Sequence, residues 1–189
     1  MKVFETELAG VVELAPAVFS DDRGYFLETF NLERYREALG PHAAAELAAV
    51  VQFNHSHSTR ATLRGLHFQE PRAQGKLVWT ARGSVFDVAV DVRRGSPGFG
   101  RWVGRELSEA NHRQLWVPPG YAHGFCVLSE VADFMYACTG YYAPDCEHSL
   151  RWDDPDLAIE WPIAEPILSD KDASAPFLAD APVLPGYRD

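Results

Sequence analysis

The sequence predicts an all-β fold and, within that class, a double-sheet jelly roll. Three observations favour it. Short apolar segments of strand length follow one another from residue 50 to residue 142. Many of the 14 Gly and 13 Pro residues stand at the ends of these segments, where they mark turns. Convincing helix signals are confined to one early segment, and many short strands separated by turns are typical of a sandwich or barrel.

The helix is expected at residues 32–39. Asn31 is a good N-cap residue, and Gly40 follows where a C-cap residue belongs. A second short helix is expected at residues 43–49. We therefore expect a few short helices at the periphery of the sheets.

The clearest strand alternation lies at residues 85–91. The apolar side chains on one face of this strand are Phe86, Val88 and Val90. Residues 77–80 precede it, and Arg82 and Gly83 between them are typical of a tight turn, so the two strands are predicted to pair as a hairpin. Further strands are expected at residues 114–117, 125–128 and 134–139, with a turn at 118–120.

Beyond residue 144 the chain is expected to be loop-rich with short helices, ending in a Pro-rich and loop-rich tail at residues 176–189. A length of 189 residues suits a single domain, residues 1–189. The hydrophobic content of 47% is enough to build a core without disulfide staples.

The charge balance bears on the class of partner. There are 27 acidic and 17 basic residues, which give a formal net charge of -10. Binding of nucleic acid depends on a basic surface, so we expect no nucleic-acid partner. A few arginines in one pocket can still hold a small phosphorylated ligand.

Cysteine use indicates the compartment. The three cysteines, Cys126, Cys138 and Cys146, are spaced for neither a disulfide framework nor a zinc site. The N-terminus lacks a signal-peptide pattern, and no apolar run approaches the ~20 residues that span a bilayer. We therefore expect a cytoplasmic protein with reduced thiols and no membrane partner.

Two segments place a histidine near a glycine in β-rich surroundings. They are LRGLHFQ at 63–69, which contains His67, and PPGYAHGF at 118–125, which contains His123. Either histidine alone also fits a structural role. The second segment contains P-x-G-x-x-H, which resembles the second half of the metal motif of cupins, and cupins are double-sheet jelly rolls.

The metal ligands of that motif are incomplete. Phe68 and Gln69 follow His67 where a cupin has further ligands, and Val127 stands four residues after His123. A catalytic metal needs about three protein ligands, and this sequence supplies two candidates. We therefore expect a cupin-type jelly roll with no metal and no cofactor, in which a histidine is free to act as a base.

Taken together, the motifs resemble those of the dTDP-4-dehydrorhamnose 3,5-epimerase family, over about residues 12 to 176. Each motif alone is weak, and their joint order and spacing make the resemblance specific. The motifs are DRGYFLE at 22–28, VQFNHS at 51–56, LRGLHFQ at 63–69, QGKLV at 74–78, VFDVAVD at 85–91, GSP at 95–97, PGYAHGF at 119–125, Tyr136, YYAP at 141–144 and LSDKD at 168–172.

The resemblance implies a substrate, a dTDP-linked 4-keto-6-deoxy sugar, whose ketone acidifies the hydrogens on C3 and C5. It also implies four catalytic roles. His67 is the base, and Asp172 orients its imidazole and raises its basicity. Tyr136 is the acid on the opposite face of the ring, and Lys76 stabilises the enolate oxygen. Apart from the resemblance, Lys76 also fits a surface lysine, Tyr136 a strand aromatic, and Asp172 a solvated charge cluster.

The resemblance also implies the substrate-binding residues. Arg23 and Arg64 contact the diphosphate, since the guanidinium fork suits phosphate oxygens. The residues implied at the nucleoside end are Glu28, Gln52 and Asn54, and His123 is implied as a supporting or ligand-contacting residue. In a straight strand Arg64 and His67 point to opposite faces, so both enter one pocket only if Gly65 permits a bulge or bend.

Two further positions are noted. Ala137 stands where many relatives of this kind carry a lysine, and that loss can alter phosphate or oxyanion contacts. Cys126 is expected to be a small buried residue and not a nucleophile.

Several alternatives stay open. Sister enzymes invert only C3 or only C5, or shift the ketone between C3 and C4, and they share this scaffold. A non-catalytic cupin that binds a sugar nucleotide, and a metal-dependent cupin dioxygenase or isomerase, are alternatives from other classes. The resemblance further implies a homodimer with exchanged N-terminal segments, for which residues 3–8 are a candidate edge strand.

Overall fold

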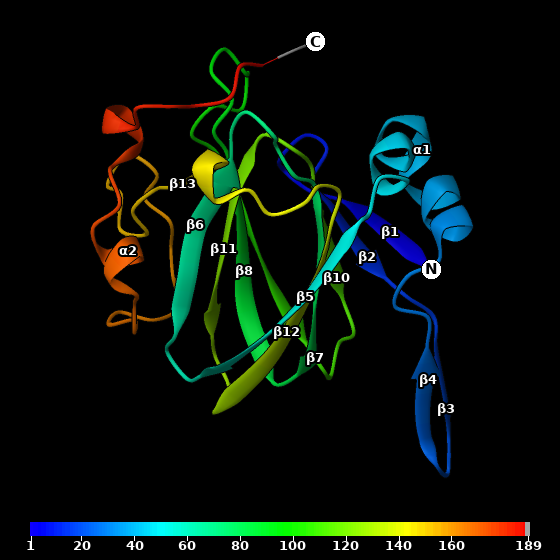
Figure 1. Cartoon of the computed structure of the whole chain (residues 1–189). Coiled ribbons are helices and arrows are strands. Elements are labelled where there is room, and N and C mark those ends of the chain that lie inside the picture. The colour runs from blue at the N-terminus through cyan, green and yellow to red at the C-terminus, as the bar shows by residue number, and fades with distance from the viewer. Residues whose placement is uncertain (188–189) are drawn as a thin grey trace.

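The computed structural model describes residues 1–187, with the side chain of His42 excepted. Two antiparallel sheets face each other and enclose the core (Figure 1). The six-stranded sheet consists, in spatial order, of β1 (Lys2–Glu5), β2 (Val12–Ala15), β10 (Gln114–Val117), β7 (Lys76–Arg82), β12 (Val131–Cys138) and β5 (Gln52–Thr59). The five-stranded sheet consists of β13 (Glu147–Ser149), β6 (Leu63–Gln69), β11 (Tyr121–Val127), β8 (Ser84–Asp91) and β9 (Trp102–Ser108). The predicted all-β, double-sheet jelly roll is confirmed.

The predicted hairpin between residues 77–80 and 85–91 is wrong. Both segments are strands, but β7 lies between β10 and β12 in one sheet, and β8 lies between β11 and β9 in the other. The turn exists, with Gly83 at a φ of 76°, and it carries the chain across from sheet to sheet. A Cβ at Gly83 would lie 2.0 Å from the carbonyl oxygen of Val131, so this corner is packed too closely for any other residue.

The helices follow the predicted pattern. Helix α1 (Leu32–Leu47) begins after Asn31, whose side chain accepts a hydrogen bond from the Arg34 amide. Gly40, at a φ of 77°, divides α1 into two helical segments, close to the two short helices that were expected. The remaining helices are one-turn elements: α2 (Asp170–Ala173) and the 3-10 turns Pro144–Cys146 and Leu178–Asp180.

The chain beyond residue 144 is loop-rich, as predicted, and residues 188 and 189 of the predicted tail lie outside the described residues. No helix in the described part of the chain is long and apolar enough to cross a bilayer.

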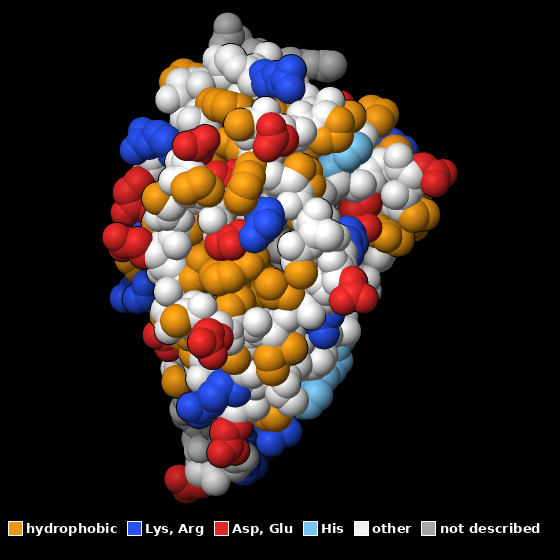
Figure 2. Space-filling view, turned by 90° about the vertical axis from the view of Figure 1, so that its left-hand side faces the viewer, with side chains coloured by type: hydrophobic (Ala, Val, Ile, Leu, Met, Phe, Trp, Pro, Cys, Tyr) orange, Lys and Arg blue, Asp and Glu red, His pale blue; other side chains and the backbone are white. Residues whose placement is uncertain are grey.

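Strand β8 separates two apolar layers. Val85 and Ala89 point into the core between the sheets. Phe86, Val88 and Val90 share the opposite face, as the alternation predicts, but that face is covered by the C-terminal segment through Leu150 and other residues. Figure 2 shows the molecule from the side of this segment, with apolar side chains gathered in the middle and charges of both signs scattered among them.

A two-stranded hairpin, which we call the arm, projects from the body of the molecule (Figure 1). It consists of β3 (Val18–Asp21) and β4 (Gly24–Leu27). Its aromatic side chains Phe19 and Phe26 are 62% and 66% exposed. An N-terminal edge strand is present as β1 at the end of the six-stranded sheet, but it ends at Glu5, so residues 6–8 of the predicted strand are not part of it.

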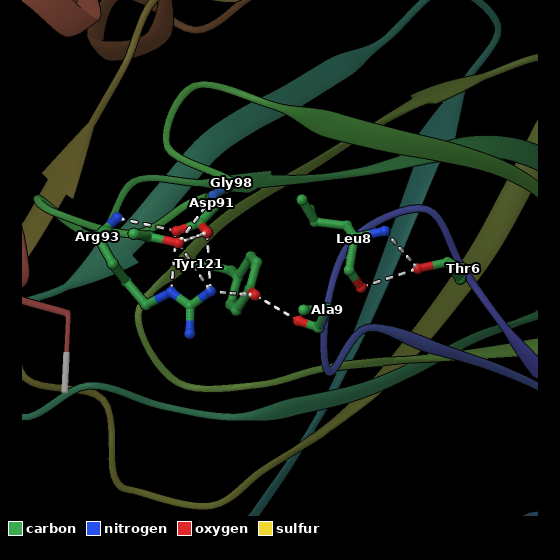
Figure 3. Close-up of polar contacts among 8 residues, drawn as sticks. Thr6, Leu8, Ala9, Asp91, Arg93, Gly98 and Tyr121 are labelled. Carbon is green, nitrogen blue, oxygen red and sulfur yellow. Dashed lines mark hydrogen bonds and ion pairs between the residues drawn. The ribbon is translucent and has the colours of Figure 1, made fainter. Parts of the chain in front are cut away.

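A polar network fastens the N-terminal segment to the ends of β8 and β11 (Figure 3). Asp91 is buried and accepts hydrogen bonds from Arg93 Nε at 2.8 Å and from the hydroxyl of Ser96. Tyr121 accepts a hydrogen bond from Arg93 and donates one to the carbonyl oxygen of Ala9. Burial alone would raise the pKa of Asp91, but the bonds from Arg93 and Ser96 outweigh it and hold that pKa below its ordinary value. The carboxylate therefore stays ionised and the network intact at neutral pH.

Tyr121→Phe tests this network. The change leaves the Ala9 carbonyl and one Arg93 N–H without this partner, so we expect the free energy of unfolding to fall by about 1–3 kcal/mol. The midpoint of thermal unfolding should fall by about 2–4 °C for each kcal/mol at this chain length. Tyr141→Phe is the matched control, because Tyr141 is 62% exposed. If both variants unfold like the parent protein, the network does not hold the N-terminal segment.

Candidate active site

A cavity of about 500 Å³ opens between the two sheets. Six of the candidate residues line it: Arg64, His67, Lys76, His123, Tyr136 and Asp172. A second cavity of about 310 Å³ adjoins it, and His67, Lys76 and Tyr136 line both. The structure therefore brings the four candidate catalytic residues to one place, from both sheets and the C-terminal segment.

His67 on β6 contacts Asp172 on α2, with 2.6 Å between His67 Nε2 and Asp172 Oδ1. Asp172 is 3% exposed. Burial alone would raise its pKa, but hydrogen bonds from His67, Ser169 and the Gly65 backbone outweigh it and hold the pKa of Asp172 below its ordinary value. Asp172 is therefore ionised at neutral pH and accepts the Nε2–H, which leaves the lone pair of His67 Nδ1 to take a proton.

Arg64 and His67 enter the same cavity because β6 bulges between them. Gly65 and Leu66 occupy the space that a single residue, Gly124, occupies on the paired strand β11. A Cβ on Gly65 would lie 2.5 Å from Gly124 Cα, and Gly65 has a φ of 137°, so no other residue fits there. The bulge that the sequence required is present.

The guanidinium of Arg64 is fixed by a hydrogen bond to β5. Its Nε donates to the hydroxyl of Ser58 at 3.0 Å, and Ser58 is buried on β5. Ser58 was not among the predicted residues, and its only signal was its place on the inward face of β5, with Gln52 and Asn54. The contact leaves the other guanidinium nitrogens of Arg64 available for a ligand.

Lys76 on β7 and Tyr136 on β12 reach the cavity from the six-stranded sheet. Burial lowers the pKa of Lys76, and the nearby Cys138, Asp87 and Glu147 offset this shift only in part. Burial raises the pKa of Tyr136, so its phenol is protonated at neutral pH. The site thus offers a half-buried lysine and a protonated phenol across the cavity from the imidazole of His67.

A second histidine–carboxylate pair lies beside the first. His123 pairs with His67 across β11 and β6, and its Nε2 lies 2.9 Å from Asp87 Oδ2. Asp87 has no exposed surface. Asp87 was not predicted as a site residue, although a carboxylate within an apolar strand indicates a buried and paired charge.

Gln52 and Asn54 line the second cavity from the inner face of β5. Gln52 donates to Asn54 Oδ1 at 2.9 Å and accepts from the Tyr142 amide at 2.9 Å. Tyr142 and Glu147 also line this cavity, and the Tyr142 hydroxyl donates to Glu147 Oε2 at 2.9 Å. Neither was predicted, although Tyr142 stands within the YYAP motif.

The structure does not bring Arg23 or Glu28 to either cavity. Arg23 stands near the turn of the arm with its side chain 89% exposed, paired to Asp21 at 2.6 Å. Glu28, at the base of the arm, accepts from Asn31 at 2.9 Å and pairs with Arg34. The ligand contacts implied for Arg23 and Glu28 stay predictions, which need a second chain or a different position of the arm.

Comparison with known proteins identifies the family. A family model described as dTDP-4-dehydrorhamnose 3,5-epimerase matches residues 5–180. The chain belongs to this family. It is 50% identical over 186 residues to the dTDP-4-dehydrorhamnose 3,5-epimerase of Pseudomonas aeruginosa, which covers 98% of this chain and 100% of that protein.

Solved structures agree. The fold matches a dTDP-6-deoxy-D-glucose-3,5-epimerase of Legionella pneumophila, crystallised with dTDP-4-keto-L-rhamnose, with a TM-score of 0.93 and 48% identity over 100% of this chain and 99% of that one. It also matches a 4-keto-6-deoxy sugar epimerase from the novobiocin gene cluster of Streptomyces spheroides, with a TM-score of 0.92 and 40% identity over 99% and 94% of the two chains. The protein is therefore an isomerase of the epimerase class.

Ala137 and Cys126, the two other positions noted in the sequence of this epimerase, are both buried. Ala137 is buried against Leu77 and Trp116 on the outer face of the six-stranded sheet, beneath α1. A lysine lost at this position does not remove a contact from the cavity, which lies on the other face. Cys126 is buried, and burial raises the pKa of its thiol to about 12, so it is the inert residue that was expected.

His67 and His123 are the two histidines that correspond to cupin metal ligands. His67 and His123 each contact a buried carboxylate through Nε2. Among the residues that the structure describes, no group of three or more His, Cys, Asp or Glu side chains is arranged to hold a metal ion.

The pKa shift of Lys76 predicts an alkaline limit to the epimerase activity. Burial lowers the pKa of Lys76 and raises that of Tyr136, so we expect Lys76 to lose its proton first as pH rises. An arginine side chain stays protonated over the whole pH range of such an assay. In Lys76→Arg the alkaline limb of kcat should therefore move to higher pH, even if kcat is lower. Steady-state assays between pH 7 and 11, with circular dichroism to check folding, measure this, and an unmoved limb would exclude Lys76 as the group responsible.

Proposed function

We propose that the protein converts dTDP-4-dehydro-6-deoxy-D-glucose into dTDP-4-dehydro-L-rhamnose by inverting C3 and C5. One arrangement supports this most directly: an imidazole and a phenol reach one cavity from facing sheets, with a lysine beside them. Inversion needs a base on one face of the sugar ring and an acid on the other. The ligand in the Legionella pneumophila structure, dTDP-4-keto-L-rhamnose, is the product of this reaction.

His67 takes the proton. The C–H bond breaks towards Nδ1, and its electron pair enters the ring as an enolate whose negative charge lies on the C4 oxygen. Asp172 accepts the Nε2–H at 2.6 Å and stabilises the imidazolium that forms. No metal ion or cofactor is needed for this step, because the ketone itself acidifies the neighbouring hydrogens.

Lys76 stabilises the enolate. An ammonium group in a buried site acts on a developing oxyanion with less screening than in water. Tyr136 then donates its phenolic proton to the carbon from the opposite face, and the enolate returns to the ketone. His67 releases its proton to solvent, and Tyr136 takes one back, so the pair is ready for the second carbon.

The diphosphate needs more positive charge than one chain supplies. Three cations, Arg64, Lys76 and Lys171, and two carboxylates, Glu147 and Asp172, line the two cavities, which leaves a single net positive charge when histidine is neutral. The diphosphate is doubly charged, and Lys76 is assigned to the ketone. A further arginine from elsewhere is therefore favoured.

We propose that this arginine is Arg23 of a second copy, in a homodimer that exchanges its arms. The arm exposes Phe19 and Phe26, and such exposed apolar surface is typical of an interface. Strands β1 and β5 are the edges of the six-stranded sheet and are open to pairing. Glu28 at the base of the arm would approach the nucleoside end with it.

We further propose that the chain works as a single domain in the cytoplasm. Cys126 and Cys138 are free and buried, and Cys146 is free and half-buried. Free thiols suit a reducing compartment.

The division of labour is tested in D₂O with dTDP-4-dehydro-6-deoxy-D-glucose. The parent protein should introduce deuterium at C3 and C5 with inversion at both. His67→Ala should lose both exchange and inversion, by about 10²–10⁴-fold or more, since loss of a general base costs that much. Tyr136→Phe should keep exchange at the first carbon attacked while net inversion falls sharply, because His67 can return a deuteron to the same face.

Mass spectrometry and NMR of the products measure exchange and configuration together. Deuterium at only one carbon in the parent protein would indicate a single-site epimerase instead. Equal loss of exchange and inversion in Tyr136→Phe, with substrate still bound, would assign Tyr136 to positioning or enolate stabilisation.

Arm exchange is tested by mixing variants. Arg23→Ala should lower kcat/KM by about 10–100-fold, the cost of a charged hydrogen bond to phosphate. A hybrid dimer of one Arg23→Ala chain and one His67→Ala chain, isolated with two affinity tags, has one site in which both residues are intact only if Arg23 serves the partner's site. We expect activity well above either variant alone. A hybrid no more active than its parents, or a monomer by light scattering at micromolar concentration, would refute arm exchange.

A further inference from the structure

Among the residues that the structure describes, Arg64 has one side-chain partner, and that partner is an uncharged hydroxyl. Arg64 Nε donates to Ser58 Oγ at 3.0 Å. Ser58 is 5% exposed, whereas Arg64 is an exposed residue. Arg64 lines the first cavity, and Ser58 lines neither of the two. Ser58 therefore reaches the site through the arginine.

We propose that Ser58 is a positioning residue that holds the guanidinium of Arg64 ready for the diphosphate of the substrate. The inference rests on the proposed function, in which Arg64 is one of the cations that receive the diphosphate. Ser58 itself is assigned no contact with the substrate.

The hydrogen bond between Ser58 and Arg64 joins the two sheets. Ser58 lies on β5, at the edge of the six-stranded sheet, and Arg64 lies on β6 of the five-stranded sheet. Nε is the inner nitrogen of the guanidinium, so a bond at Nε restricts rotation of the whole group. The terminal nitrogens Nη1 and Nη2 stay available as a fork, and such a fork donates to two phosphate oxygens at once.

The charge of Arg64 acts inside the cavity. Burial raises the pKa of Tyr136, and the positive charge of Arg64 opposes that shift. A hydroxyl partner leaves this positive charge uncompensated, whereas a carboxylate partner would offset it. Arg105, which lines neither cavity, is paired instead with the carboxylate of Glu13 at 3.0 Å. A serine is therefore the kind of partner that suits an arginine kept for an anionic ligand.

The turn between Ser58 and Arg64 does not need their hydrogen bond for its own structure. The backbone amides of residues 60–63 each donate to a backbone carbonyl, and the acceptors are Glu130, Val127, Thr59 and Ile167. Loss of the Ser58 hydroxyl should therefore release the side chain of Arg64 without moving the turn. This separates a positioning role from a structural one.

Ser58→Ala tests the proposal with ligands that do and do not carry phosphate. The Kd of dTDP and the KM of dTDP-4-dehydro-6-deoxy-D-glucose should rise by about 3- to 10-fold, the cost of ordering one flexible side chain on binding. The Kd of thymidine, which has no phosphate, should stay within about twofold, and kcat within about threefold. Calorimetry measures dTDP binding, and ligand-observed NMR measures thymidine binding. Ser58→Thr keeps the hydroxyl and should bind dTDP nearly as well as the parent.

Thr80→Val is the matched control. Thr80 is 4% exposed, lies on β7 of the same sheet as Ser58 and lines neither cavity. Its hydroxyl has no hydrogen-bond partner among the described residues. Loss of this equally buried hydroxyl should leave the Kd of dTDP unchanged.

A double-mutant cycle with Arg64→Met decides whether Ser58 acts through the arginine. In the Arg64→Met background, Ser58→Ala should have almost no further effect on the Kd of dTDP, because the group that it positions is gone. An effect as large as in the parent would overturn the proposal, since it would indicate direct contact with the ligand or a change in the fold. Unchanged dTDP binding in Ser58→Ala, or equal losses for dTDP and thymidine, would also overturn it.

Failure of the proposed function gives a different result. If Arg64→Met binds dTDP as well as the parent, Arg64 is not a phosphate contact, and the inference about Ser58 falls with it. If His67→Ala retains epimerase activity, the proposed chemistry fails, but the coupling between Ser58 and Arg64 in dTDP binding still stands.

Discussion

The close approach of Gly65 to Gly124 is the constraint on which the candidate active site depends. A side chain at Gly65 would lie 2.5 Å from the backbone of β11, so the two strands meet only because both residues are glycine. The bulge that this contact permits directs the side chains of Arg64 and His67 towards the same cavity. Without it, regular alternation would send the side chain of either Arg64 or His67 to the outside of the sheet.

Two facing sheets suit a reaction that needs opposite faces of one ring. The five-stranded sheet supplies His67, the six-stranded sheet supplies Lys76 and Tyr136, and the cavity of about 500 Å³ lies between them. Asp172 comes from neither sheet. It belongs to a loop-rich segment, so the orientation of the His67 imidazole depends on how that segment is held against β6.

Local patterns in the sequence predicted where strands lie better than they predicted which strands pair. The alternation at residues 85–91 correctly identified a strand and its shared face, but not the sheet, because a glycine turn joins strands within a sheet or between sheets equally well. Asp172 looks like a solvated charge within Asp170-Lys171-Asp172, and only the fold buries it. Asp87 and Ser58 were missed, because their roles follow from contacts between strands distant in sequence.

The carboxylates near Lys76 affect its pKa as well as the residues with which they pair. A cation acts most strongly on an enolate oxygen where water is excluded, yet the same burial lowers its pKa and favours the neutral amine. Asp87, with no exposed surface, and Glu147 raise the pKa of Lys76 and oppose that loss. Asp87, which His123 contacts through Nε2, therefore bears on Lys76 as well as on its own partner. The positive charge of Lys76 is therefore favoured by the carboxylates of Asp87 and Glu147 and opposed by its own burial.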